Sequence, residues 1–421
     1  MNITISIIVP THDRCFSLMR LLDILSRQTY PAHLFDVVIV ADGCSDGTIK
    51  MLQQYEAPFT FRYIEQPGQG AATARNNGAV AATGEILLFL DDDIEPSLDL
   101  VMAHAGAHKN KNSVVVGYLP MSLPKKATIH QIGLITWWEQ KYRNMSNPGY
   151  RYGYDDLLSG NFSISSIFFN KVNKFDCAFS CREDYELGAR LIKSGAEIIF
   201  SGKAWGYHRD ETTNVVRLHQ RRRQEGKADL QFAKKHPELL ANLPLAHYDT
   251  RHSIKKKAFL YFIFNSPFII NKAAFFLPRL LIMLEILKQR TSWHKLNGSL
   301  HQYWYLRGVA DEAKTLKGLT AFFQTALPDK VKENNELKLN LDLKAGLLDA
   351  EKQIDQFRPD SVRINYGDHF IGEILPRPGL ERLRGAHLRP LLATHFPESL
   401  MHALVMEQIA DGTFKRKIQE V

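Results

Sequence analysis

Short continuous runs of apolar residues, each followed by a polar loop, recur along the first hundred residues of the chain. Ile5–Val9, Val37–Val40 and Ile86–Leu90 are such runs, and Phe61–Ile64 is a shorter one. Strands that are buried on both faces of a sheet have this pattern, because neither face needs polar side chains. The pattern therefore predicts four strands that end in polar loops.

Amphipathic segments separate these strands. Leucines recur at helical spacing in Phe16–Leu25, the polar turn Ala41–Thr48 can cap a helix that begins near Ile49, and Ala71–Ala82 predicts a further helix. Alternating strands and helices form a parallel sheet with right-handed crossovers, so the loops after the strands line one crevice. The predicted fold class is α/β, with a Rossmann-like, mostly parallel sheet.

Three consecutive carboxylates, Asp91, Asp92 and Asp93, follow the apolar run that ends at Leu90. Carboxylates this close repel one another unless a cation or hydrogen-bond donors lie between them, and hard divalent cations prefer such oxygen ligands. The end of a strand is also where open α/β sheets bind ligands. A metal site is therefore one interpretation, and a solvated turn closed by Pro96 is the other.

The loop after the first strand, Pro10–Arg14, disfavours two common nucleotide-binding classes. It lacks the Gly-x-Gly-x-x-Gly turn of nicotinamide enzymes, and the sequence has no Gly-x-x-x-x-Gly-Lys-Ser/Thr loop. The sequence consequently lacks the main evidence that would assign it to the dehydrogenases or the P-loop hydrolases.

Four motifs, in this order along the chain, resemble those of family 2 glycosyltransferases, which have the GT-A fold. The motifs are Ile7–Arg14, Val40–Thr48, Ala74–Gly78 and Leu90–Asp93, and Ser159–Asn161 with Arg182–Leu187 extends the resemblance. The resemblance implies an enzyme that binds a nucleotide sugar, such as a UDP-sugar.

The resemblance assigns several residues to the donor nucleotide. Pro10 and Thr11 would shape the loop against the nucleotide with help from Asp13, and Asp42 would accept hydrogen bonds from the base or ribose. Arg75 would hold phosphate oxygens, because a guanidinium matches their geometry. The alternatives are a turn or helix cap for Asp42 and a surface ion pair for Arg75.

The resemblance also implies a cofactor, Mg²⁺ or Mn²⁺, that binds the diphosphate. Asp91 and Asp93 match the Asp-x-Asp signature whose carboxylates meet the ribose and the metal. Asp92 lies between them and is also assigned to the donor nucleotide. In an extended chain its side chain would point to the side opposite those of Asp91 and Asp93. His208 falls where these enzymes often place a late histidine near the metal, and imidazole suits Mn²⁺ better than Mg²⁺. The alternative for His208 is an ordinary hydrogen-bonded role.

Asp184 matches the catalytic base of the family, in the pair Glu183-Asp184 at the start of a predicted helix over Tyr185–Lys193. A base there would take the proton of the acceptor hydroxyl, and a single displacement would invert the anomeric centre. Because any helix N-terminus favours carboxylates, an ordinary first-turn acid is the alternative.

Composition fits a globular enzyme, with 421 residues, 45% hydrophobic and 23% charged. The four cysteines, Cys15, Cys44, Cys177 and Cys181, do not form a paired zinc motif, so we expect free thiols in a reducing cytoplasm. The early apolar run has no preceding basic region and ends at Pro10, so we expect a strand and not a signal peptide. These features predict a cytoplasmic protein.

Residues 251–290 combine eight basic residues with one acid, Glu285. The apolar stretches Ala258–Ile270 and Ala273–Leu287 are interrupted and shorter than the 20 or so residues that a membrane span needs. Amphipathic helices at the interface, with Lys255–Lys257 near anionic lipid heads, fit this pattern, and a helical lid packed on the catalytic domain is the alternative. The expectation is a peripheral association with the cytoplasmic face of the membrane.

The composition changes again beyond residue 330. Leu337–Leu343 alternates as a half-buried strand does, Val362–Tyr366 and Phe370–Ile374 predict a hairpin, and Leu380–Leu392 and Leu400–Ile409 predict helices. We therefore expect three parts: a catalytic domain over 1–235, a helical segment over 236–328, and a small α/β module of unknown role over 329–421.

Together these features predict an inverting, metal-dependent hexosyltransferase-type enzyme of cell-envelope or extracellular polysaccharide synthesis, acting on a glycan or lipid-linked acceptor. A nucleotidyltransferase would share the sheet and the carboxylates but usually has a glycine-rich basic loop after its first strand. A catalytically silent scaffold would keep the crevice but lose Asp93 or Asp184. The formal charge of +8 raises the possibility of nucleic acid, but no aromatic stacking platform accompanies the basic residues.

Overall fold

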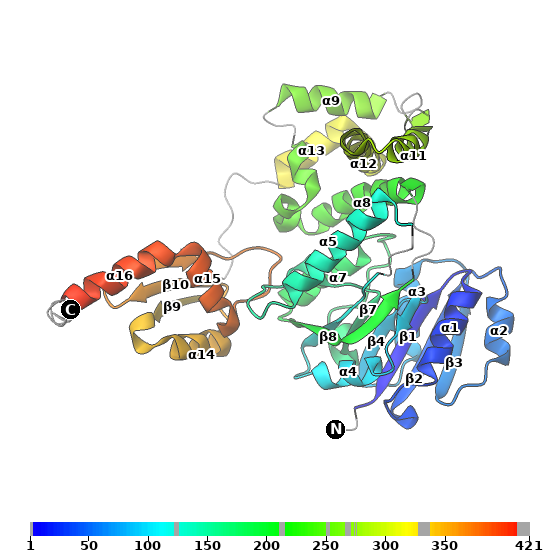
Figure 1. Cartoon of the computed structure of the whole chain (residues 1–421), viewed down its shortest axis with the longest axis horizontal. Coiled ribbons are helices and arrows are strands. Elements are labelled where there is room, and N and C mark those ends of the chain that lie inside the picture. The colour runs from blue at the N-terminus through cyan, green and yellow to red at the C-terminus, as the bar shows by residue number, and fades with distance from the viewer. Residues whose placement is uncertain are drawn as a thin grey trace. The chain divides into compact units, whose positions relative to one another are not determined.

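The computed structural model describes residues 3–121, 126–209, 215–249, 253–265, 271–272, 274, 276–326 and 337–410 (Figure 1). The chain forms two compact units. Unit 1 consists of Met1–Tyr142 and Tyr154–Asp329, and unit 2 of Arg143–Gly153 and Lys330–Val421. The predicted boundary at Pro328-Asp329 lies outside the described residues, and the three-part division stays a prediction.

A sheet with eight described strands forms the centre of unit 1, in the order β3-β2-β1-β4-β7-β6-β8-β5. The strands are β1 (Ile5–Thr11), β2 (Phe35–Asp42), β3 (Thr60–Gln66), β4 (Ile86–Leu90), β5 (Ile94–Pro96), β6 (Ser113–Tyr118), β7 (Asn161–Ser165) and β8 (Glu197–His208). All four predicted strands are confirmed as β1 to β4, which pair in parallel. Beyond them the sheet is mixed, because β7 runs antiparallel to both β4 and β6.

The register of the parallel strands brings their carboxyl ends to one edge. Thr11 pairs with Ala41, and Asp42 pairs with Gln66. β4 ends at Leu90, directly before the acidic turn. The polar loops predicted to share a crevice therefore follow neighbouring strands at the same edge.

Helices cover the sheet of unit 1. They are α1 (Cys15–Leu25), α2 (Thr48–Gln54), α3 (Ala71–Ala81), α4 (Leu100–Ala107), α5 (Ile129–Met145), α6 (Ser166–Lys171) and α7 (Glu183–Lys193). The leucines that predicted α1 are all buried. On α3, a side chain at Gly78 would collide with Ile8 of β1, so glycine allows this helix to lie close to the sheet.

A helical segment completes unit 1, with α8 (Val215–Lys235), α9 (Ile254–Asn265), α11 (Pro278–Ile286), α12 (Arg290–Ala313) and α13 (Leu316–Ala326). These helices share one apolar core, to which α9 contributes Leu260 and Ile263 and α11 contributes Leu281. Among the described helices, none combines the length and apolar composition that a bilayer crossing requires.

Two glycines let α8 and α12 pack at very short distance. A side chain at Gly226 would collide with the backbone carbonyl of Tyr305, and one at Gly308 would collide with the carbonyl of Arg223. The obstacles are backbone atoms, which cannot move without shifting a helix.

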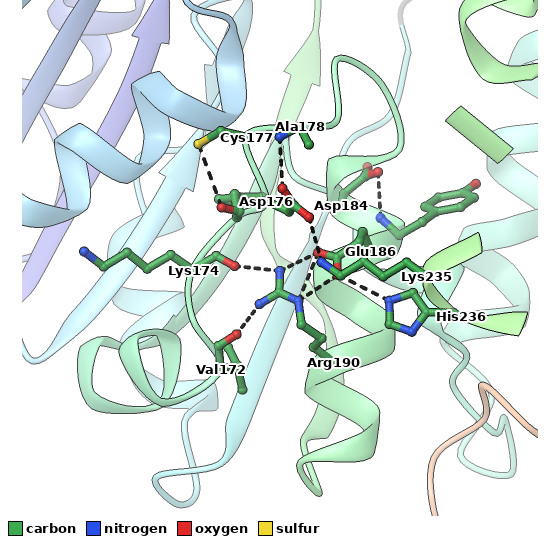
Figure 2. A network of polar contacts seen from close by, with 12 residues as sticks. Val172, Lys174, Asp176, Cys177, Ala178, Asp184, Glu186, Arg190, Lys235 and His236 are labelled. Atoms are coloured by element: carbon green, nitrogen blue, oxygen red, sulfur yellow. Dashed lines mark hydrogen bonds and ion pairs between the residues drawn. The ribbon is translucent and has the colours of Figure 1, made fainter. Parts of the chain in front are cut away.

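A buried carboxylate ties α7 to its neighbours (Figure 2). Glu186 is fully buried and accepts hydrogen bonds from Arg190 Nε at 2.9 Å, and it lies 2.7 Å from Lys235 Nζ and 3.3 Å from His236 Nε2. Burial raises the pKa of Glu186, but hydrogen bonds from His236, Arg190 and Lys235 outweigh it and lower the pKa to about 2. The Arg190 guanidinium also donates to the carbonyls of Val172 and Lys174. This charge network fixes α7 between the loop after α6 and the end of α8.

Unit 2 is a three-stranded sheet, in the order β11-β10-β9, with helices around it. Its elements are β9 (Lys338–Asp342), α14 (Leu347–Phe357), β10 (Ser361–Tyr366), β11 (His369–Ile374), α15 (Leu388–His395) and α16 (Pro397–Ala410). The predicted strand, the hairpin and the last helix are confirmed. The helix predicted from Leu380 begins only at Leu388, because the backbone of Leu380 and Glu381 pairs with Gly153 and Tyr152 instead.

Gly308→Ala tests the close contact of α8 with α12. The methyl group would press on the Arg223 carbonyl, so we expect the free energy of unfolding to fall by about 1–3 kcal/mol. Gly298→Ala is the matched control on the same helix, since a side chain at Gly298 meets no atom within 4 Å and alanine favours helix. Thermal unfolding should separate the two variants, and equal midpoints would contradict the packing argument.

Candidate functional site

The carboxylate of Asp42, at the end of β2, organises the loop between β3 and α3. It accepts hydrogen bonds from Gln66 Nε2 at 2.8 Å, from Gln69 N at 2.7 Å and from Gly70 N at 2.8 Å. Gly70 is the N-cap residue of α3, so Asp42 fixes the backbone immediately before that helix. The side chain is only 8% exposed, which gives this rim of the crevice a fixed shape.

Asp13 joins the loop after β1 to the loop after β2. The residue has a left-handed backbone (φ 51°), and its Oδ1 accepts hydrogen bonds from Ser45 N at 2.6 Å and Asp46 N at 3.1 Å. The hydrogen bond from the Ser45 backbone lowers the pKa of Asp13. Thr11 and Pro10 belong to β1 itself, and the Thr11 hydroxyl donates to Asp92 Oδ2 at 2.7 Å.

Arg75 connects the acidic turn to α7. The guanidinium is 4% exposed, and it donates to Asp91 Oδ1 at 2.8 Å and to Glu183 Oε1 at 3.0 Å. Burial disfavours the charge of Arg75, but the two carboxylates outweigh this effect and raise its pKa. The residue predicted to hold phosphate is thus engaged with two acids at the edge of the crevice.

Asp92 and Asp93 share one partner, Arg14. The Arg14 guanidinium donates to Asp92 Oδ1 at 3.0 Å and also to Asp93 Oδ2. The expectation that Asp92 points away from its neighbours by strand alternation is wrong, because residues 92 and 93 form a turn and it is Asp91 that faces a different guanidinium. Burial raises the pKa of Asp92 to about 6.

Two of the three predicted metal ligands lie together. Asp93 Oδ1 is buried without a hydrogen-bond donor, and it lies 3.5 Å from His208 Nε2. His208 is held there because it pairs with Ile94 in the β5–β8 ladder. Burial raises the pKa of Asp93, but His208 and Arg14 outweigh it and lower the pKa to about 2, so the carboxylate is ionised. An ionised oxygen beside an imidazole is a donor set that suits a divalent cation.

The third predicted ligand, Asp91, does not join this pair. Within the described ranges, three metal-ligating atoms gather only at Asp13, Cys44 and Asp46, an exposed loop cluster whose two carboxylates already accept backbone hydrogen bonds. Asp91 instead accepts from Arg75, and its side chain is one-third exposed. The predicted ligands are therefore not a preformed set of three.

Asp184 lies in the first turn of α7, and its Oδ1 accepts a hydrogen bond from Tyr185 N at 2.9 Å (Figure 2). Burial, and then the charge of Glu183, raises the pKa of Asp184 to about 6. A carboxylate with a pKa near neutrality is a better proton acceptor than an ordinary aspartate.

Residues that the sequence did not single out hold Asp184 in place. Arg182, immediately before α7, has a left-handed backbone (φ 65°), and its guanidinium lies 4.3 Å from the centre of the Tyr185 ring. Arg182 Nε lies 3.2 Å from Asp229 Oδ1, and the Tyr305 hydroxyl donates to Asp229 at 2.8 Å. In the sequence, the position of Arg182 close to the predicted base could have indicated its role. Nothing in the sequence marks Asp229 of α8 or Tyr305 of α12.

Comparison with known proteins gives a consistent result. Residues 6–169 match the model of glycosyl transferase family 2. Validoxylamine A glucosyltransferase of Streptomyces hygroscopicus subsp. jinggangensis is 28% identical over 275 residues, which are 57% of this chain and 62% of that protein. Chondroitin synthase of Pasteurella multocida is 27% identical over 253 residues, 50% of this chain and 25% of that protein. The chain thus spans about three fifths, or less, of these relatives.

Among solved structures, the mannosyltransferase PcManGT from Pyrobaculum calidifontis aligns with 16% identity and a TM-score of 0.45, over 73% of this chain and 87% of that one. The family match runs from β1 into α6 and contains Asp42, Arg75 and the acidic turn. The family match confirms the resemblance inferred from the motifs. Residues 6–169 of this chain are those that match glycosyl transferase family 2.

Proposed function

We propose that the protein transfers a sugar, with inversion, from a nucleotide-sugar donor to an acceptor hydroxyl, and that the transfer depends on a divalent metal. One observation carries most of the proposal. Arg75 joins Asp91, at the end of β4, to Glu183, the neighbour of Asp184. This bridge supports the proposal, because one side chain binds both a strand-end carboxylate and the neighbour of a carboxylate with a raised pKa, and donor binding and base catalysis need such groups close together.

We assign the donor nucleotide to the loops that Asp42 and Asp13 organise, beside Pro10, Thr11 and Asp92. Their hydrogen bonds support this assignment because they fix both rims of the crevice before any ligand enters. For Arg75 we propose a positioning role, since its donors already bind Asp91 and Glu183.

We assign the metal, Mg²⁺ or Mn²⁺, to Asp93 and His208, with Asp91 beside it. The buried oxygen of Asp93 that lacks a donor supports this assignment. When bound, a divalent cation would neutralise charge that develops on the departing diphosphate. Arg14 keeps both Asp92 and Asp93 close to the strand end, so the acids stay in place without a ligand.

Asp184 would act as the general base. The acceptor oxygen forms a bond to the anomeric carbon while the bond from that carbon to the diphosphate oxygen breaks, and the hydroxyl proton passes to Asp184. Attack opposite the leaving group inverts the anomeric centre. The ion pair of Arg182 with Asp229 supports this role, because it anchors the residue that precedes the first turn of α7. The charge of Arg182 lowers the pKa of Asp184, but burial and the charge of Glu183 outweigh it.

We also propose that the outer face of α9 and α11 rests on the cytoplasmic surface of an anionic membrane and that the acceptor is a glycan or lipid-linked glycan of the cell envelope. Large apolar side chains on this face are exposed, among them Phe262 at 55% and Ile286 at 73%. Lys255–Lys257 and Arg279 are exposed beside them. Apolar side chains rimmed by cations suit the interface of an anionic bilayer.

Asp93→Asn tests the donor and metal assignments. Full-length protein is incubated with a panel of nucleotide sugars plus Mn²⁺ or Mg²⁺, with glucosyl donors first because of the glucosyltransferase relatives, and release of nucleoside diphosphate is measured. The variant should lose metal-dependent donor turnover by about 100-fold or more, since a neutral amide binds the cation weakly. Asp23→Asn, an exposed acid on α1, is the control. Equal turnover of the Asp93 variant would refute the metal site.

Asp184→Asn tests the base. Donor affinity should persist, whereas transfer should fall by about 10²–10⁴-fold. In the unsubstituted protein, kcat should decline as the pH falls through about 6, because the raised pKa means that Asp184 takes up a proton there and can no longer accept one. A pH profile of transfer checks both statements, and an active variant with the same acid limb would exclude Asp184 as the base.

Phe262→Ser combined with Ile286→Ser tests the membrane contact. Flotation with vesicles that contain an anionic lipid should fall by more than about tenfold, because two exposed apolar side chains are lost from the interface. Leu348→Ser, which removes a side chain of similar exposure from α14, should float like the unsubstituted protein. Undiminished flotation of the double variant would count against this surface.

A further inference from the structure

Unit 2 contains a cavity of about 580 Å³ that is separate from the crevice of unit 1. Its walls come from two stretches that are distant in the sequence. One wall is the segment 143–153, and the others are the end of β11, the chain after it and the end of α15. A volume of this size is typical of small-molecule sites.

Two glycines give the cavity its shape. A side chain at Gly149 would collide with Pro390, so glycine lets the segment 143–153 lie directly on α15. A side chain at Gly372 would collide with the ring of Phe396, so this ring lies on β11. The hydrogen bond from Tyr152 N to the buried Glu381, 3.1 Å long, fixes the segment further. The cavity is therefore built by specific close contacts.

Two arginines of the cavity lining form no direct ion pair with a carboxylate among the described residues. Arg151 and Arg377 both line it, and neither has a carboxylate partner within ion-pair distance in the described part of the chain. Arg151 donates through Nε to the carbonyl of Glu381 at 2.7 Å, whereas the carboxylate of Glu381 is bound by Arg384 at 2.7 Å. Burial lowers the pKa of Arg151 to about 10; the charge of Glu381 opposes this effect, the charge of Arg377 adds to it, and the charge of Asp360 opposes it. An anionic ligand would give the two guanidinium groups a direct partner.

The remaining lining indicates what else the ligand contains. The rings of Tyr150 and Phe396 offer flat apolar surfaces, and Asn147 brings an amide whose Oδ1 accepts a hydrogen bond from Gly149 N at 2.9 Å. Glu373 also lines the cavity, and a carboxylate accepts hydrogen bonds from hydroxyl groups but repels a ligand with several negative charges. A ring with hydroxyl groups and one acidic group satisfies all of these features.

We propose that this cavity binds an anionic sugar residue, either a hexuronate or a sugar phosphate. As part of the acceptor glycan, such a residue would let unit 2 hold the polymer while its end is extended in unit 1. That use of the site depends on the proposed glycosyl transfer, whereas the binding itself does not.

Saturation-transfer NMR with the full-length protein tests the binding, with glucuronate, glucose 6-phosphate and neutral glucose as probes. At least one anionic probe should bind with a Kd at least about tenfold lower than that of glucose, since charged hydrogen bonds exceed neutral ones. Binding of glucuronate alone would identify a carboxylate ligand, and binding of glucose 6-phosphate alone would identify a phosphate ligand. Equal or absent binding of all three probes would overturn the proposal.

Substitutions assign the signal to this cavity. Arg377→Ala and Arg151→Gln should each weaken the binding of the anionic probe by about tenfold and leave nucleoside diphosphate release unchanged. Lys352→Ala removes one charge from exposed α14 and should have no effect on binding. Unchanged affinity in both arginine variants would overturn the assignment. Because transfer is measured separately, loss of transfer with intact binding would refute only the proposed enzymatic function.

Discussion

The charge bridge through Arg75 is the interaction on which the rest of the site depends. A guanidinium with 4% exposure is costly to bury unless acids surround it, and here Asp91 and Glu183 do so. Asp91 belongs to the turn after β4 and Glu183 to the start of α7, two places far apart in the sequence. One buried side chain therefore links them, and its removal would leave Asp91 and Glu183 without their shared cation.

A second set of charges holds α7. Glu186 binds Arg190, Lys235 and His236 (Figure 2). Arg182, which precedes the helix, binds Asp229. Lys235 and Asp229 belong to α8, which packs against α12 through Gly226 and Gly308. The helical segment after the family 2 match therefore contributes to the placement of the first turn of α7.

The first half of the sheet could be predicted from the sequence because β1, β2 and β4 are continuous apolar runs with buried faces. β8 escaped prediction, since its residues alternate irregularly between buried and exposed positions and no run marks it. The acidic turn and Asp184 were found through motifs. The ion pairs of Arg14 with the acidic turn and of Arg182 with Asp229, and the hydrogen bond of Tyr305 to Asp229, were not, because these contacts join residues far apart in the sequence and leave no local periodicity.

The cavity of unit 2 takes one of its walls from the segment 143–153, which the ribosome makes long before the rest of that unit. Tyr152 cannot bind Glu381 until more than half the length of the chain has followed. During synthesis this segment therefore remains without its contacts in unit 2 while most of unit 1 is being made. A gene fragment that begins near residue 330 does not encode the segment 143–153 and therefore not the whole of unit 2. A chain that is truncated near residue 330 keeps this segment but loses the residues of unit 2 that it contacts.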